Sequence, residues 1–239
     1  ASLGSSTVGK IVGGYDIHTK KYDISILQNG QFVGGNTEDD RTTYKTLSFD
    51  ESTKGWTSFY TYAPDFIASL GNSFYSFKRG KLYKHYDPSV NRGEFYGFAR
   101  PASVTFIFNP NVSMSKTFKT VNYEGSNGWQ VDLFKSDAEG VDDLLSYSDT
   151  ANTVKSYNEG VYVDGGIEYR VGFNRKENKY FANLVNNSAA RPGEVLFGNT
   201  TTGIKGYFTT VKLSTDANTD LGGIKELFAV STEFVVSSR

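Results

Sequence analysis

The chain has 239 residues, a formal net charge of −1 and no cysteine. Its length allows one large all-β domain or two small ones, and its balanced charge argues against a nucleic-acid binder, which usually carries a basic excess or stripe. The missing cysteines exclude disulfides and thiolate metal sites, while 36 aromatic residues (18 Phe, 16 Tyr and 2 Trp), with 25 Gly and only 5 Pro, favour strands joined by tight turns.

The first half of the sequence predicts short strands connected by compact hairpins. Strand-like runs occupy residues 11–33, 44–49, 56–62, 73–77 and 81–85. Residues 64–70 are expected to form a short helical turn or a loop. The N-terminal residues 1–7 lack the basic and apolar regions of a signal peptide, and we expect the chain to be part of a longer protein.

The second half predicts longer strands and larger loops. Strand-like runs occupy residues 103–108, 116–123, 129–134, 167–173, 180–185, 206–213 and 226–236. Strict alternation along the second of these runs places Phe118, Thr120 and Asn122 on one face, and Val121 and Tyr123 on the other.

The fold class predicted from these patterns is all-β, with antiparallel hairpins forming a sandwich or a propeller-like body. The polar, acidic segment at about 136–158 is expected to project as a long arm rather than to join the core. A change in strand length near residues 98–102 suggests a hairpin-rich, propeller-like sub-domain at 1–98 and a second β sub-domain with the arm at 99–239. A single β body with a long arm fits the sequence as well.

Three segments share one design, in which two aromatic residues seven positions apart bracket a polar stretch. The brackets are Tyr15 and Tyr22, Phe49 and Trp56, and Phe173 and Tyr180. An Asp or Asn follows the first aromatic residue each time, and such a residue can bond the backbone two positions on and start a turn. We therefore expect three hairpins with the aromatic residues paired across the strands; convergent hairpins in any β protein are the alternative. Trp56 and Trp129, each at the start of a strand, are expected to be buried.

No motif for catalysis is found in the sequence. Neither a Gly-x-Ser-x-Gly elbow nor a phosphate-binding loop occurs. The two histidines, His18 and His85, lack the close partners of a metal site and are interpreted as exposed polar residues. No cofactor, metal or enzymatic activity is expected.

The most basic stretch is the turn formed by Lys78, Arg79, Lys81 and Lys84. It is the one candidate for a weak contact with DNA phosphates, and simple solvation of a hairpin turn is the competing interpretation. Tyrosines such as Tyr60, Tyr62, Tyr83 and Tyr86 could stack on sugars, although packing in the core or between subunits is the usual role of such residues.

Several long and distinctive stretches occur at residues 46–51, 54–64, 72–85, 95–97, 104–109 and 116–126. Together they resemble virion structural proteins of tailed bacteriophages, especially crAss-like phages and related podoviruses. The resemblance covers roughly residues 10–130 and, weakly, the C-terminal end. It implies a large tail protein of the nozzle or muzzle kind, of which this chain is a C-terminal piece or a shortened relative, and it implies no catalytic residues.

The resemblance predicts a non-enzymatic component of the virion tail or neck that contacts other copies of itself in a ring around the DNA exit channel, and also contacts neighbouring virion proteins. Non-specific contact with packaged DNA is possible, and no membrane partner is expected. Two alternatives stay open: a carbohydrate-binding β module for host-surface recognition, and a glycan-degrading β enzyme with two carboxylates across a cleft.

Overall fold

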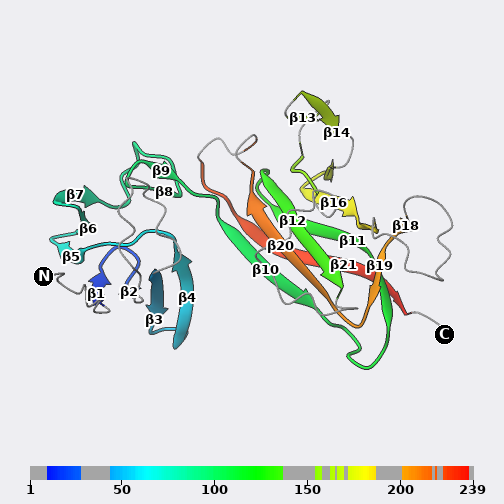
Figure 1. The fold of residues 1–239 in the computed structure, drawn as a ribbon, viewed down its shortest axis with the longest axis horizontal. Helices are drawn as coiled ribbons and strands as arrows, with labels where there is room; N and C mark the ends of the chain where they lie inside the picture. The colour runs from blue at the N-terminus through cyan, green and yellow to red at the C-terminus, as the bar shows by residue number, and fades with distance from the viewer. Residues whose placement is uncertain are drawn as a thin grey trace, which may run out of the picture. The chain divides into compact units, whose positions relative to one another are not determined.

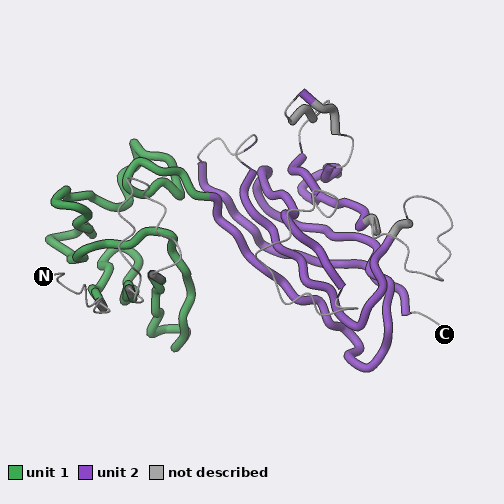
Figure 2. The backbone as a smooth tube through the Cα atoms, in the orientation of Figure 1, with its two compact units in different colours: residues 1–100 green, residues 101–239 purple. Residues whose placement is uncertain are grey.

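The chain folds into antiparallel β-sheets (Figure 1). The computed structural model describes residues 10–27, 44–136, 154–157, 162–164, 166–169, 172–186, 201–216, 219 and 223–236. The all-β prediction is confirmed, but the sheets of these residues close into neither a barrel nor a propeller. The chain separates into two compact units, unit 1 at residues 1–100 and unit 2 at residues 101–239 (Figure 2). Among the described residues no helix is long and apolar enough to cross a membrane.

Unit 1 is built from strands that pair with their neighbours in sequence. A four-stranded meander contains β1 (Lys10–Asp16), β2 (Lys21–Leu27), β3 (Tyr44–Asp50) and β4 (Gly55–Tyr60). A three-stranded sheet contains β5 (Phe66–Leu70), β6 (Ser73–Lys78) and β7 (Lys81–Lys84), and β8 (Glu94–Phe95) pairs with β9 (Phe98–Ala99).

Strand β5 corrects the expectation of a helical turn or loop at residues 64–70. Ile67 is 2 % exposed and packs with Val12 and Phe74 in a small core between the two sheets. Gly14 allows this contact, because a Cβ there would lie 3.0 Å from Cγ1 of Ile67. Ser69 ties β5 to β1, since its hydroxyl donates to the carbonyl of Tyr15 at 2.6 Å. Contacts with a distant strand thus decide the structure of this segment.

Unit 2 is a sandwich of two sheets. The first has the order β10 (Ser103–Phe108), β20 (Thr209–Thr215) and β12 (Trp129–Ser136). In the second, β11 (Lys116–Gly125) pairs with β16 (Lys179–Asn183), β19 (Ile204–Gly206) and β21 (Leu227–Val236), while β15 (Asn174–Lys176) pairs with β16. Two short hairpins join β13 (Tyr162–Asp164) to β14 (Ile167–Tyr169) and β17 (Val185–Asn186) to β18 (Thr201–Thr202).

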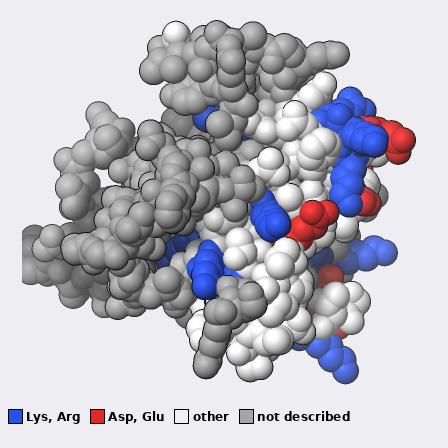
Figure 3. Space-filling model, turned by 90° about the vertical axis from the view of Figure 1, so that its right-hand side faces the viewer, with Lys and Arg blue, Asp and Glu red and all other residues white. Residues whose placement is uncertain are grey.

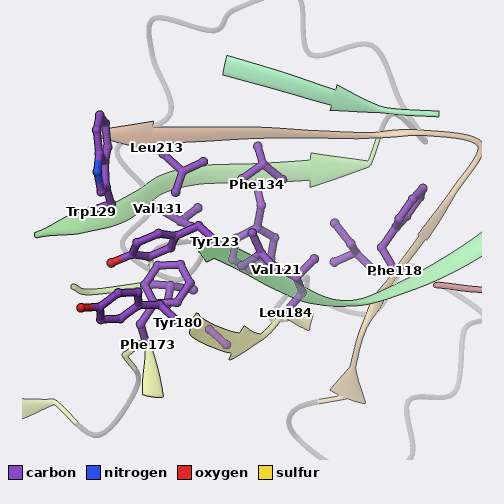
Figure 4. Packing of buried hydrophobic residues seen from close by; sticks show 14 residues of the cluster. Phe118, Val121, Tyr123, Trp129, Val131, Phe134, Phe173, Tyr180, Leu184 and Leu213 are labelled. Atoms are coloured by element: carbon purple, nitrogen blue, oxygen red, sulfur yellow. The ribbon is translucent and has the colours of Figure 1, made fainter. Parts of the chain in front are cut away.

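The core of unit 2 lies between these two sheets (Figure 4). Trp129, Val131 and Leu213 enter it from one sheet, and Tyr123 and Tyr180 enter it from the other. Each fully buried apolar side chain contributes about 1.5–3 kcal/mol, so this cluster of fourteen buried residues is the main source of stability in unit 2.

A β-bulge in β11 changes which residues face that core. The register of β11 against β21 shifts between Phe118 and Thr120. Phe118 and Val121, three residues apart, are consequently both fully buried, although strict alternation had assigned them to opposite faces. That assignment was wrong because a bulge inserts one unpaired residue and reverses the alternation beyond it.

The end of the predicted arm also belongs to the core. Val154 is 1 % exposed and forms an antiparallel bridge with Val131, while the hydroxyl of buried Ser156 donates to Oδ2 of Asp216 at 2.7 Å. The prediction of an arm over about 136–158 is therefore wrong at its C-terminal end, and Ser136 closes β12. Residues 137–153 lie outside the described residues.

Candidate functional site

The bracketing aromatic residues of the first two segments form one row across the meander. Tyr15 lies opposite Tyr22, Tyr22 opposite Phe49, and Phe49 opposite Trp56. The rings of Phe49 and Trp56 meet edge to face, with centroids 5.3 Å apart. Four side chains from four strands therefore share one level on one face of the sheet.

The turns between these aromatic residues are closed by the expected Asx bonds. Oδ1 of Asp16 accepts from the backbone N–H of His18 at 2.9 Å, and Oδ1 of Asp50 accepts from that of Ser52 at 2.8 Å. Lys20 and Lys54, at equivalent positions, adopt left-handed backbone conformations with φ of 58° and 52°. The hydrogen bonds at Asp50 hold the pKa of its carboxyl below the usual value. The two turns are structural repeats.

The third segment differs from the first two. Tyr180 lies opposite Arg175 rather than Phe173, and the turn at Glu177 and Asn178 has two residues. Phe173 and Tyr180 are both buried and both contact Tyr123, whose ring centroid lies 4.9 Å and 4.6 Å from theirs. The same seven-residue spacing between aromatic residues therefore occurs in two different kinds of hairpin.

The outer face of the meander is apolar and exposed. Its exposed side chains are Ile11 (73 %), Tyr15 (48 %), Tyr22 (43 %), Trp56 (49 %) and Phe59 (74 %). The half-buried Ile24, Ile26, Leu47 and Phe49 lie among them. We call these nine residues the outer apolar face. The expectation that Trp56 is buried is wrong, whereas Trp129 is buried at 6 % exposure.

The inner face of the same sheet is polar and buried. Its members Asp16, Asp23, Ser25, Thr46 and Ser48 are each no more than 5 % exposed. Antiparallel sheets with one solvated face usually place apolar residues inward, whereas here most inward residues are polar and Val12 is an apolar exception. Alternation in the sequence reveals two faces for each strand, but it does not say which face turns inward.

Tyrosine hydroxyls from the second half of unit 1 bond one carboxylate oxygen of each buried aspartate, while Oδ1 of Asp23 has no hydrogen-bond partner among the described residues. Tyr62 donates to Oδ2 of Asp23 at 3.1 Å, and Tyr86 donates to Oδ2 of Asp16. Burial raises the pKa of the Asp23 carboxyl and, together with the nearby carboxylates, raises the pKa of both tyrosines. Tyr62 is 3 % exposed, so it is a structural residue rather than a sugar platform.

His85 forms part of the same cluster, which corrects its interpretation as an exposed residue. Its Nε2 lies 2.7 Å from Oγ of Ser76, which also accepts a hydrogen bond from Tyr96 at 3.0 Å. The ring packs on Tyr62 and Phe74. Burial lowers the pKa of His85 to about 4, so the imidazole is neutral near pH 7.

The paired Ser76 and His85 resemble the nucleophile and base of a hydrolase, but their placement does not suit that role. Ser76 is fully buried, and its hydroxyl is occupied by His85 and Tyr96. The pair therefore joins β6 to the loop after β7. His18 is exposed and stacks on Tyr86, with ring centroids 4.2 Å apart. No group of three metal-ligating side chains occurs among the described residues.

The basic turn is the predicted hairpin between β6 and β7. Arg79 and Gly80 have φ of 50° and 75°, as a type I′ turn requires, and the backbone N–H of Arg79 donates to Asp65 at 2.6 Å. Lys81 and Lys84 are exposed. The turn therefore carries a local basic group beside a carboxylate. Positive and negative side chains likewise lie close together on the face drawn in Figure 3.

Comparison with known proteins gives two similarities. Residues 90–187 match the family model for the Crassvirus muzzle protein C-terminal domain. A curated relative, the muzzle protein of Bacteroides phage crAss001, is 27 % identical over 148 residues, which is 61 % of this chain. The chain spans about 10 % of the length of that relative.

The matched family region overlaps the stretch expected from the sequence only between residues 90 and 130. It extends across β10, β11 and β12 to β17, and so includes much of the core of unit 2. Both comparisons confirm the predicted resemblance: this chain is similar to the muzzle proteins of crAss-like phages, through residues 90–187 in the family model.

Proposed function

We propose that the chain is a non-enzymatic structural component of the virion tail, making contacts between subunits in a ring around the DNA exit channel. The match of residues 90–187 to the muzzle C-terminal domain carries this proposal. The coarser part, a structural virion protein, follows from that similarity. The ring, the channel and the absence of catalysis are inferences from it.

The geometry of unit 1 supports a structural role. The side chains best suited to chemistry, Ser76 and His85, engage each other below the surface. The exposed side chains of the meander are instead large and apolar, which is the composition of the centre of a protein–protein interface.

The basic turn is proposed as a weak contact with packaged DNA. Lys78, Arg79, Lys81 and Lys84 would meet phosphates without sequence preference. Binding of labelled duplex DNA should then weaken steeply with salt, and replacing Lys81 and Lys84 with Gln should reduce the salt slope by roughly two. A control variant, Lys119→Gln, changes an exposed lysine of unit 2 and should leave the slope unchanged. Equal DNA binding by both variants would refute the contact.

A carbohydrate-binding module is the second candidate, because Tyr15, Tyr22 and Trp56 form an exposed aromatic row. Sugars stack on such rings but also require hydrogen-bonding groups around them. The side chains beside these rings, Ile24, Leu47 and Phe49, supply no hydrogen-bonding groups. A glycan array probed with the full chain tests this candidate, and saturable binding abolished by Trp56→Ala would favour it.

Location in the intact particle tests the main proposal. Antibodies raised against this chain should label the tail region of purified virions in electron micrographs. Antibodies absorbed with the purified chain serve as the control and should not label. Detection only as a soluble protein outside particles, or turnover of a glycan by the purified chain, would overturn the proposal.

A further inference from the structure

The outer apolar face is the largest feature of unit 1 that the contacts within the described residues leave unexplained. Its five exposed side chains come from β1, β2 and β4. They are joined through the register: Ile11 opposes Ile26, Ile24 opposes Leu47, and Leu47 opposes Phe59. The face is therefore continuous across all four strands rather than a scatter of single residues, which would need no explanation.

The shape of this face suits another sheet. Gly13 lies within it, and a Cβ there would come within 2.9 Å of the hydroxyl oxygen and 3.1 Å of Cε1 of Tyr22. The Tyr22 ring thus lies down over the bare backbone of Gly13 instead of standing upright. Sheets that pack face to face lie about 10 Å apart, with the side chains of the two faces interdigitating.

The area of the face suits an oligomer contact. An aromatic side chain buries about 150–250 Å², so the five exposed side chains offer on the order of 500 Å² of apolar surface. A stable interface takes about 800 Å² from each partner, a value that this face approaches once its half-buried residues and its rim are included. The expected contact is weak in isolation.

Lys45 and Glu51, at the two ends of β3, favour one orientation, although exposed Lys20 and Lys54 lie at the same end of the sheet as Glu51. Lys45, at the start of the strand and opposite Ile26, is exposed, and Glu51, directly after the strand, is also exposed. If two copies pack with antiparallel strands, Lys45 of each meets Glu51 of the other. A parallel arrangement would instead place like charges together, which costs affinity.

From these observations we infer that the outer apolar face binds the same face of a second copy, sheet on sheet, with the strands of the two copies antiparallel. This inference goes beyond the proposed function, because a face that binds its own copy closes a pair, whereas contacts around a ring join two different surfaces. A virion protein that assembles through another surface would leave the proposed function standing and would overturn this inference.

The first experiment measures association of the full chain by sedimentation over a concentration range up to about 100 μM, where an interface of this size should be populated. The wild-type chain should form dimers. Phe59→Glu should weaken association at least about tenfold, because it buries a charge within the contact. The matched control is Ile107→Glu, which changes a similarly exposed residue of unit 2 (67 %) and should leave association unchanged.

The second experiment tests orientation by exchanging charges. At low salt, Lys45→Glu should weaken the dimer about two- to fivefold, and the double variant Lys45→Glu/Glu51→Lys should restore it. Because the exchange keeps the net charge of the pair, recovery cannot arise from total charge.

A third measurement does not depend on charged variants. Trp129 is buried, so iodide quenching reports chiefly on Trp56, and quenching should fall as the protein concentration rises. Any one of four results would overturn the inference. The wild-type chain could stay monomeric, or its dimer could tolerate Phe59→Glu. The quenching of Trp56 could be independent of protein concentration, or the charge exchange could fail to restore association.

Discussion

Phe49 and Trp56 meet edge to face across β3 and β4, with ring centroids 5.3 Å apart, and yet Trp56 remains half exposed. The pair thus adds local stability to a hairpin while presenting its second ring outward. Trp56 therefore lies at the surface, whereas Trp129 lies in the core of unit 2. Substitutions at the two positions should then differ in their effect on stability.

Replacing each tryptophan with Ala should give unequal losses of stability. Trp129→Ala removes a side chain from the core of unit 2 and should cost roughly 3–5 kcal/mol. Trp56→Ala removes a half-exposed ring and one aromatic contact, so a loss of about 1 kcal/mol is expected. Urea unfolding of both variants checks this, and equal losses would contradict the assignment of Trp56 to the surface.

The stability of unit 1 should fall as the pH is lowered from about 6.5 towards 4. His85 has a pKa of about 4 in the folded chain and one near 6.5 when unfolded. The unfolded state therefore binds more protons in this window, which destabilises the fold by roughly 2–3 kcal/mol at the acidic end.

His85→Gln should flatten this dependence, as urea midpoints across the same pH range would show. Asp23 contributes with the opposite sign, because its pKa is raised by burial and protonation of its carboxyl relieves that cost. An unchanged pH slope in the variant would assign the dependence to other groups.

Lys116→Met should destabilise unit 2 by about 1–3 kcal/mol. Lys116 is fully buried, and its Nζ donates to the carbonyls of Pro110 and Asn111. Methionine fills the space but leaves both carbonyls without that donor. Lys119→Met, at an exposed position of the same strand, is the control and should change thermal stability by less than about 0.5 kcal/mol.

Limited proteolysis should divide the chain near residue 98. The predicted sub-domain boundary lies there, and Phe98 is 42 % exposed, which makes it accessible to chymotrypsin. Two resistant fragments are expected on a gel and by mass spectrometry. Early cleavage within β6 or β11 would instead indicate that the units do not fold as separate domains.

Strands with strong local signals were predictable from the sequence. The alternation of residues 103–108 predicts β10, and the basic residues around Gly80 predict the hairpin of β6 and β7. In both cases the pattern of side chains and the preferences of the turn residues suffice, because the neighbouring strand is near in sequence or the alternation is unbroken.

Features that depend on distant contacts were not predictable. The bulge after Phe118 appears only in the pairing of β11 with β21, more than a hundred residues further on. Val154 lies in a polar stretch and is buried because it meets Val131. The exposure of Trp56 depends on which face of the meander is covered by β5 and the tyrosines that follow. The sequence alternates in the same way whichever of the two faces is buried.

The pairing of β10 and β12 with β20 has a consequence for the order of folding. These two strands are made early, yet each pairs with residues 209–215 rather than with the other. The meander of unit 1, by contrast, pairs only neighbouring strands. Closing long loops slows folding, and domains begin to fold during synthesis. During translation the meander can therefore form while β10 and β12 still lack their shared partner, β20, which has yet to emerge from the ribosome.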